Sequence, residues 1–366
     1  MMSNQLKHIF ALETSCDETA AAVLEFSQDR TEHSFKILSN IVASQIQIHK
    51  KWGGVYPELA SRAHLESIIP VIEQATKPIG GIKKFGKNID AISYTKEPGL
   101  IGSLLIGIET AKILGAYFKK PIISINHLEG HIYAAFCGKI KSEKPKIKGE
   151  IENSKFEVSK SGIFPILALI VSGGHTSLIL MKDHLQYQTV GETIDDAAGE
   201  AFDKVARIIG LSYPGGPEIE KIAKSGNGNA YDLPIAMKDS SNLNFSFSGL
   251  KTAVLYLTKD PATGKGHKFN KADLAASFQE TVAQILALKT NQAIKKYNPE
   301  TVIFTGGVSA NSYLRDYLSN EISKITHAKI LIPHRNLSTD NAVGIAIAGA
   351  IKFSKNKKSS WRKLDA

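Results

Sequence analysis

A strand, a polar turn and a second strand occur twice in this sequence, and this internal repeat restricts the fold more than any other feature. The first copy, HIFALETSCDETAAAVLEF, has an apolar run that ends at Glu13 and a second run that begins at Ala20. The second copy, PILALIVSGGHTSLILM, covers residues 165–181. Either copy alone indicates only an ordinary β-hairpin. Two copies about 155 residues apart, each followed by a helical pattern, predict two duplicated lobes.

The turns of both hairpins carry small, polar residues: the first reads TSCDE and the second SGGHT. Backbone N–H groups on such turns can surround a phosphate without steric obstruction. A third loop runs from an apolar strand at 302–304 through Gly306 and Gly307 into a helix that contains Asn311. A lone Gly-Gly turn is usually only a turn, but three such loops together favour a nucleotide cleft between the lobes.

Helical and strand patterns alternate between the two hairpins. Residues 58–76 and 103–118 have helical periodicity, and residues 91–94 and 122–125 are typical of short buried strands. This alternation predicts an α/β fold, and 366 residues fit two lobes at roughly 150 residues each. We expect an N-terminal lobe at 1–138, an exposed lysine-rich insertion at 139–162, a C-terminal lobe at 163–351 and a basic tail at 352–366.

The positive charge is concentrated near the C-terminus. Lys and Arg number 45 against 35 Asp and Glu, and residues 352–366 supply +5 of the resulting +10. This balance suits nucleic-acid contact, but it equally suits a solvated surface. No run approaches the roughly 18 apolar residues of a membrane span, and no secretory leader can be fitted at the start. Cys16 and Cys137 form no disulfide framework, so we expect a cytoplasmic protein without membrane contact.

The sequence NHLEGH at 126–131 directly follows a short apolar strand. On a helix, His127 and His131 share a face and can direct ring nitrogens at one metal ion, although an isolated pair also lines many helix starts. Glu129 takes the second spacer position, not the first as in metalloprotease H-E-x-x-H, so its carboxylate projects away from that face. A carboxylate from elsewhere would complete a set typical of Fe(II), with Zn(II) as the alternative, and Asp340 is the candidate.

A further acidic segment covers residues 195–209, which have a helical pattern and precede a rigid turn at 213–217. Its carboxylates include Asp195 and Asp203. On this pattern alone, a solvated acidic helix face is favoured over a ligand site.

The chain resembles the bacterial TsaD family, the tRNA adenosine threonylcarbamoyltransferases once labelled O-sialoglycoprotein endopeptidases. The matching segments follow the family order nearly end to end: ETSCDET, GGVYPELASRAHLE, NHLEGH, VSGGHTSL, GETIDDAAGEAFDKVARIIGLSYPGGP, FSFSGLKTAV, TGGVSANSYLR and STDNAVGIA. The resemblance implies the actin-like fold of sugar kinases and heat-shock ATPases (ASKHA), with two duplicated lobes around a nucleotide cleft. The chain departs from the family at Glu97-Pro98-Gly99, where Gly-Pro-Gly is usual, and in its longer 139–162 segment.

The resemblance also implies the chemistry. It implies transfer of the threonylcarbamoyl group from threonylcarbamoyl-AMP to N6 of the adenosine 3′ of the anticodon, in tRNAs that read codons beginning with A. It implies one divalent metal, Fe(II) or alternatively Zn(II), on His127, His131 and Asp340. A TsaB-like paralogue and a TsaE-like ATPase are the implied partners. The implied contacts of the adenylate are Ile170, Val171, Ser172, Gly173, Gly174, Asp203, Gly216, Glu220 and Asn311.

Three points stay open at this level. Asp17, on the first turn, is our candidate for the base or the orienting group of the attacking amine. A metalloprotease is the first rival, and it requires a water-activating carboxylate on the ligand face that the sequence does not offer. A non-catalytic, nucleotide-binding regulator is the second, since the fold alone would allow it. Activity on tRNA with the adenylate donor separates all three.

Overall fold

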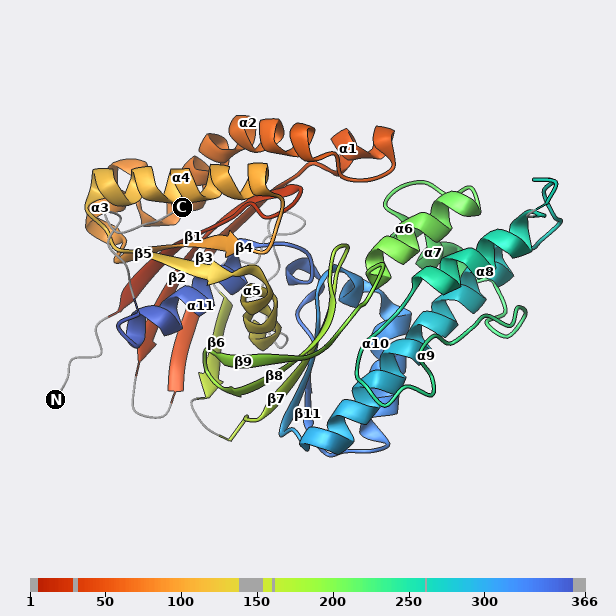
Figure 1. The fold of residues 1–366 in the computed structure, drawn as a ribbon. Helices are drawn as coiled ribbons and strands as arrows, with labels where there is room; N and C mark the ends of the chain where they lie inside the picture. Colours follow the sequence, from red (N-terminus) through yellow and green to blue (C-terminus); the bar gives the residue numbers. More distant parts are fainter. Residues whose placement is uncertain (1–5, 29–31, 138–153, 160–161, 261, 358–366) are drawn as a thin grey trace. The chain divides into compact units, whose positions relative to one another are not determined.

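The computed structural model describes residues 6–28, 32–137, 154–159, 162–260 and 262–357. The chain divides into two compact units (Figure 1). Unit 1 consists of residues 1–49, 55–163 and 333–366, and unit 2 of residues 50–54 and 164–332.

Each unit is built on one sheet. The order in unit 1 is β5-β4-β1-β2-β3-β6, and the strands are β1 (Lys7–Glu13), β2 (Glu18–Gln28), β3 (Glu32–Ser44), β4 (Ala91–Glu97), β5 (Ile122–Asn126) and β6 (Ser154–Ser159). The order in unit 2 is β11-β10-β7-β8-β9, and the strands are β7 (Ile166–Val171), β8 (Thr176–Asp183), β9 (Gln186–Glu192), β10 (Thr301–Thr305) and β11 (Lys329–Leu331).

The two sheets repeat one topology, which confirms the predicted duplication. In unit 1, β1 pairs antiparallel with β2 and parallel with β4, and in unit 2 β7 pairs antiparallel with β8 and parallel with β10. β5 and β11 extend the parallel edge of their sheets, and β3 and β9 the antiparallel edge. Both hairpins of the sequence repeat therefore occupy equivalent places.

Helices cover both faces of the unit 1 sheet (Figure 1). They are α1 (Ile46–His49), α2 (Pro57–Thr76), α3 (Phe85–Asn88), α4 (Ile101–Phe118), α5 (His127–Ala134) and α11 (Ala342–Ser354). Strand side chains alternate between faces, so Phe10 and Leu12 join the core beneath α2 and α4, whereas Ile9 faces α11 near Gly349. The unbroken apolar run of β1 thus reflects a strand that is buried on both faces.

Unit 2 has its own core. Its helices are α6 (Ala198–Ile208), α7 (Gly215–Ala223), α8 (Ser248–Thr258), α9 (Lys271–Tyr297) and α10 (Ser312–Ser323). Leu167, Leu169 and Val171 of β7 pack with Phe202 of α6 and Phe278 of α9, whose rings meet edge to face at 5.0 Å.

Two features differ from the sequence prediction. Residues 154–159, expected within an exposed insertion, form β6, because Phe156 stacks on Phe35 of β3 with ring centroids 5.2 Å apart. Residues 139–153 and 160–161 of that insertion lie outside the described part of the chain. Helix α11 was expected in the C-terminal lobe, but it packs on β1, β2 and α5 of unit 1.

Helix α4 is more apolar than the sequence analysis allowed. Among the described residues it is the one helix long and apolar enough to cross a membrane, with a mean hydropathy of 1.4 over 18 residues. Length and composition are the only evidence for a span. The helix contains Glu109 and Lys112 and packs against β4 and α2, which places it in the fold of unit 1.

Candidate metal centre and substrate loops

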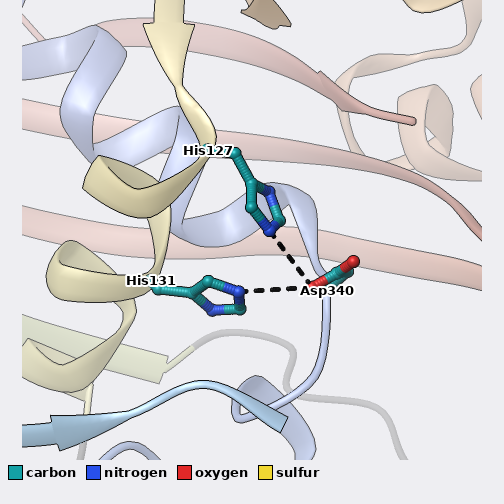
Figure 2. Close-up of side chains that lie close together, drawn as sticks. All are labelled: His127, His131 and Asp340. Atoms are coloured by element: carbon teal, nitrogen blue, oxygen red, sulfur yellow. Dashed lines mark ion pairs between the residues drawn. The ribbon is translucent and has the colours of Figure 1, made fainter. Parts of the chain in front are cut away.

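The start of α5 brings the two histidines onto one side of the helix. Asn126 ends β5 and caps α5, because its side chain accepts a hydrogen bond from the backbone N–H of Leu128 at 2.9 Å. This cap fixes His127 as the first helical residue, and His131 follows one turn later. Their ring centroids lie 4.6 Å apart (Figure 2).

Asp340 completes the cluster from the loop before α11. The next residue, Asn341, caps α11 by accepting from the N–H groups of Val343 and Gly344 at 3.0 and 3.3 Å. Asp340 Oδ1 lies 3.5 Å from His127 Nε2 and 3.3 Å from His131 Nε2 (Figure 2). The three ligand atoms lie within 4.8 Å of one another, so this group could hold one metal ion.

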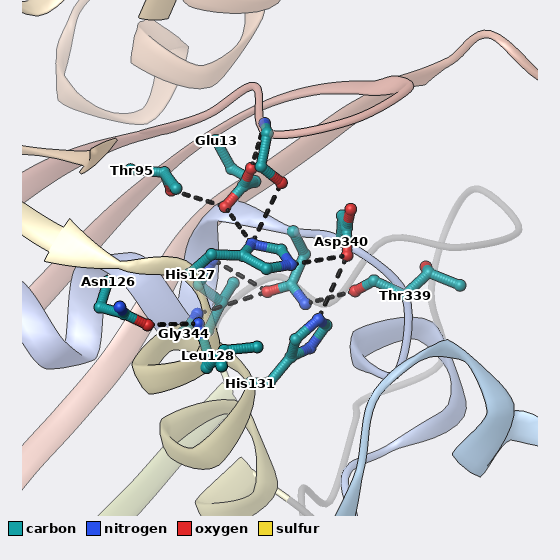
Figure 3. Close-up of polar contacts among 12 residues, drawn as sticks. Glu13, Thr95, Asn126, His127, Leu128, His131, Thr339, Asp340 and Gly344 are labelled. Carbon is teal, nitrogen blue, oxygen red and sulfur yellow. Dashed lines mark hydrogen bonds and ion pairs between the residues drawn. The ribbon is translucent and has the colours of Figure 1, made fainter. Parts of the chain in front are cut away.

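A buried carboxylate that the sequence analysis missed, that of Glu13, contacts the Nδ1 side of the His127 ring. Glu13 Oε2 lies 3.0 Å from His127 Nδ1 and accepts the hydroxyl hydrogen of Thr95 at 2.6 Å (Figure 3). Its other oxygen accepts from the backbone N–H of Ser15 at 2.5 Å. A proton on Nδ1 is thereby favoured, which leaves the lone pair of Nε2 directed at Asp340. The donor set therefore suits a metal ion.

The electrostatics of the metal-free cluster favour a positive charge between its carboxylates. Burial lowers the pKa of His127, but the charges of Glu13 and Asp340 outweigh this effect and raise it to about 9. Burial alone would raise the pKa of Glu13. The charge and the hydrogen bond of His127 outweigh burial, so the pKa of Glu13 is lowered. A divalent cation would replace the proton that His127 carries in its absence.

Glu129 points away from the cluster, as its place in the HLEGH spacer predicts. Its Oε2 pairs with Lys352 Nζ of α11 at 2.9 Å, and its side chain is buried. Glu13 contacts Nδ1 of His127 and not the Nε2 side that faces Asp340, and three polar contacts already engage it. Neither group is placed like the water-activating glutamate of H-E-x-x-H proteases.

Asp17 lies at the tip of the first hairpin, partly exposed, and its backbone oxygen accepts from Gln45 N–H at 3.0 Å. Its charge adds to burial in raising the pKa of Glu18 well above the usual range, and the pKa of the Cys16 thiol is raised for the same reasons.

The second hairpin forms a closed turn in unit 2. The N–H of Ser172 donates to His175 O at 2.8 Å, and Ser172 Oγ accepts from the N–H of His175 at 3.1 Å. A Cβ at Gly173 or Gly174 would meet no atom within 4 Å, so the surface of this turn is open. Gly199 of α6 packs directly beneath it, because a Cβ there would lie 2.5 Å from Ser172 O. Ile170 and Val171 are buried in the preceding strand.

The remaining predicted substrate residues also lie in unit 2. Asp203 Oδ1 accepts from the N–H of Gly215 at 2.6 Å and so fixes the start of α7, which carries Gly216 and Glu220. Residues 215–217 of the predicted turn therefore belong to the first turn of α7. Glu220 Oε1 accepts from the N–H of Ser312 at 2.9 Å, at the start of α10.

The sequence analysis placed Asn311 inside a helix, but it is the residue directly before α10. Its side-chain oxygen accepts from the N–H of Leu314 at 3.1 Å, and its side-chain nitrogen donates to Gln279 Oε1 at 2.8 Å. Asp195 likewise lies outside the predicted helix, because α6 begins at Ala198. Its carboxylate accepts a hydrogen bond from the N–H of Phe247, just before α8, at 2.8 Å. Both side chains therefore hold a helix start in place.

The family departure at Glu97 falls on an exposed strand end. The last glycine of the usual Gly-Pro-Gly is present as Gly99. It packs closely on the first hairpin, because a Cβ at Gly99 would lie 2.5 Å from Ser15 O. Gly306 makes the equivalent approach in unit 2, where a Cβ would lie 2.4 Å from Val171 O. Both β-to-helix loops thus pack against the hairpin of their own unit.

Fold and site together define an actin-like protein that carries a candidate two-histidine, one-carboxylate metal centre. Two solved HypF structures share the fold: full-length HypF in the phosphate- and nucleotide-bound form (TM-score 0.55, 14% identity) and HypF of T. kodakarensis (TM-score 0.56, 11% identity). This chain is covered to 97% in both comparisons, and the two HypF chains to 47% and 49%.

The family model described as TsaD, tRNA N6-adenosine threonylcarbamoyltransferase, matches residues 36–148 and 145–347. A relative of that name from Bacillus subtilis (strain 168) is 44% identical over 354 residues, covering 97% of this chain and 93% of its own length. Another, from Thermosipho melanesiensis, is 48% identical over 341 residues, covering 93% of each chain. The chain belongs to the TsaD family.

Proposed function

We propose that this protein transfers the threonylcarbamoyl group from threonylcarbamoyl-AMP to N6 of the tRNA adenosine 3′ of the anticodon, in tRNAs reading codons that begin with A. The observation that carries the proposal is the His127, His131 and Asp340 cluster in a chain that matches the TsaD family over most of its length.

The reaction needs an activated donor, because the exocyclic amine of adenine delocalises its lone pair into the ring and is a poor nucleophile. N6 attacks the carbamoyl carbon, a C–N bond forms, and the C–O bond to the phosphate breaks. AMP leaves with the electron pair, and N6 loses one proton to a base. The mixed anhydride supplies AMP as the leaving group, which an unactivated threonylcarbamate lacks.

His127, His131 and Asp340 would hold the metal, and Fe(II) is our first choice because this ligand set is typical of it, with Zn(II) as the alternative. When bound, the ion would supply Lewis-acid neutralisation of charge on donor oxygens. Glu13 keeps His127 in one tautomer and one orientation, with help from Thr95. The orientation of His127 is thus set by residues of this chain.

We assign the adenylate to the unit 2 residues Ile170, Val171, Ser172, Gly173, Gly174, Asp203, Gly216, Glu220 and Asn311. The open surface of the Ser172 turn supports this assignment, since backbone N–H groups there can approach an oxyanion or a phosphate closely. Asp203 and Glu220 contribute by fixing the starts of α7 and α10.

Asp17 remains our candidate for the base or orienting group at N6. Its place at the partly exposed tip of the first hairpin supports the role, because a base must reach the attacking amine. Replacing Asp17 by Asn should then lower turnover more than donor affinity.

A TsaB-like paralogue and a TsaE-like ATPase are the proposed protein partners, in the cytoplasm, where tRNA is available. Support for a protein partner comes from six exposed apolar side chains on the neighbouring helices α2 and α4: Leu65, Ile69, Ile101, Leu105, Ile113 and Tyr117. Exposed apolar side chains that gather on a folded unit are typical of a protein interface. We assign it to the paralogue, and Ile113→Asp should then abolish co-purification.

The test is incubation with labelled threonylcarbamoyl-AMP and unmodified tRNA, with and without the two partners, followed by nucleoside analysis. Label on N6 of the adenosine 3′ of the anticodon supports the proposal. A tRNA that stays unlabelled with every partner present would favour the regulator, and cleavage of a glycoprotein substrate would favour the protease. The family relationship and the position of Glu129 give no support to the protease.

A further inference from the structure

Lys352 lies in the last turn of α11 and contacts the segment that leads into the metal-binding helix. Its Nζ donates to Glu129 Oε2 at 2.9 Å and to the backbone oxygen of Ser124 at 3.2 Å. Ser124 belongs to β5 and Glu129 to α5, so one ammonium group joins the strand and the helix on either side of His127. The sequence analysis counted Lys352 with the basic tail, but its charge is paired within unit 1.

The Glu129–Lys352 pair is largely removed from water. The Glu129 side chain is 1% exposed and that of Lys352 20%. Glu129 Oε1 is buried and has no hydrogen-bond partner among the described residues. The carboxylate therefore depends on one ammonium group, and loss of that group would leave a buried charge without compensation.

Helices α5 and α11 also meet at a pair of glycines. A Cβ at Gly344 would lie 2.0 Å from the backbone oxygen of Gly130, so the two backbones are in direct contact there. Lys352 follows Gly344 by eight residues, which is about 12 Å along a helix. Packing of both helices on the sheet also restrains their crossing, and the Glu129–Lys352 pair adds a further contact far along α11 from the glycines.

We propose that Glu129 and Lys352 are positioning residues of the metal site, which set the angle between α5 and α11. The histidines lie on α5 and Asp340 lies two residues before α11, so this angle sets the separation of the ligand atoms. The inference rests on the proposed metal site. It assigns a function to two charges that lie outside the ligand set.

The test measures Zn²⁺ affinity by chelator competition and the unfolding temperature of the metal-free protein, for the full chain and its variants. Lys352→Met should weaken Zn²⁺ binding about tenfold, the lower end of what losing a supporting contact costs. Lys352→Arg should restore affinity to within about twofold, because it keeps a cation at the same place. Lys357→Met, which changes an exposed lysine beyond the helix, is the matched control and should change neither quantity.

The double variant Glu129→Gln, Lys352→Met separates positioning from plain stabilisation. With the buried charge removed, its unfolding temperature should recover toward wild type, while Zn²⁺ affinity should stay about tenfold weak. Wild-type Zn²⁺ affinity in the double variant would overturn the inference alone. Wild-type Zn²⁺ affinity in His127→Ala would overturn the proposed metal site, and this inference with it.

Discussion

Gly344→Ala perturbs the metal centre from outside its ligand set. The added Cβ would lie 2.0 Å from the backbone oxygen of Gly130, whereas ordinary contact begins at 3.4 Å. Relief requires the two helices to separate by about 1.4 Å, which costs about 1–3 kcal/mol of unfolding free energy. Metal coordination tolerates only about 0.2 Å, so Asp340 would no longer close the set with His127 and His131. We expect metal affinity to fall at least about tenfold.

The assay pairs urea unfolding of the metal-free protein with chelator-competition measurement of Zn²⁺ affinity. Gly249→Ala is the matched control, because Gly249 also lies in a helix and its Cβ would meet no atom within 4 Å. The control should leave both quantities unchanged. Wild-type Zn²⁺ affinity in Gly344→Ala, together with a reduced unfolding free energy, would refute the argument that the α5–α11 spacing sets the ligand geometry.

Three further predictions concern protonation, the substrate loop and the tail. The raised pKa of His127 stabilises the metal-free protein below the ordinary pKa of 6.5, and this stabilisation is lost as pH rises through about 9. Unfolding free energy should therefore fall over that range while Zn²⁺ affinity rises, and an affinity independent of pH would contradict this. Gly199→Val should displace Ser172 and weaken adenylate binding in calorimetry, since its Cβ would lie 2.5 Å from Ser172 O; unchanged binding would exclude that packing argument. Deleting residues 355–366 should weaken tRNA binding at low salt and flatten its salt dependence, yet leave turnover at saturating tRNA intact; abolished turnover would make the tail part of the productive complex.

Local pattern was enough to predict most of the framework. The apolar runs at 91–94 and 122–125 lie within β4 and β5, and the helical patterns at 58–76 and 103–118 lie within α2 and α4. The HxxxH spacing predicts a shared helix face, because the period of an α-helix fixes it without reference to the rest of the chain. The hairpins were also predictable from local sequence, because two apolar runs flank a short polar turn.

Contacts between residues distant in sequence were not predictable from such patterns. The charge of Lys352 looked solvated because its partner Glu129 is 223 residues away. Glu13 looked like the end of an apolar strand, and only the pairing of β1 with β4 and of β4 with β5 brings it beside His127. Residues 154–159 carry only two apolar side chains, and their strand was not predictable because Phe156 stacks on the distant Phe35.

The central claim is that one metal ion on His127, His131 and Asp340 supports threonylcarbamoyl transfer to tRNA. The most direct measurement strips the protein of metal, returns Fe(II) or Zn(II) in steps, and follows transfer from labelled threonylcarbamoyl-AMP to unmodified tRNA with both partners present. The account predicts transfer that rises with bound metal and levels off at about one equivalent, and no such rise in Asp340→Asn. Full transfer by the stripped protein, or a wild-type response in Asp340→Asn, would contradict it.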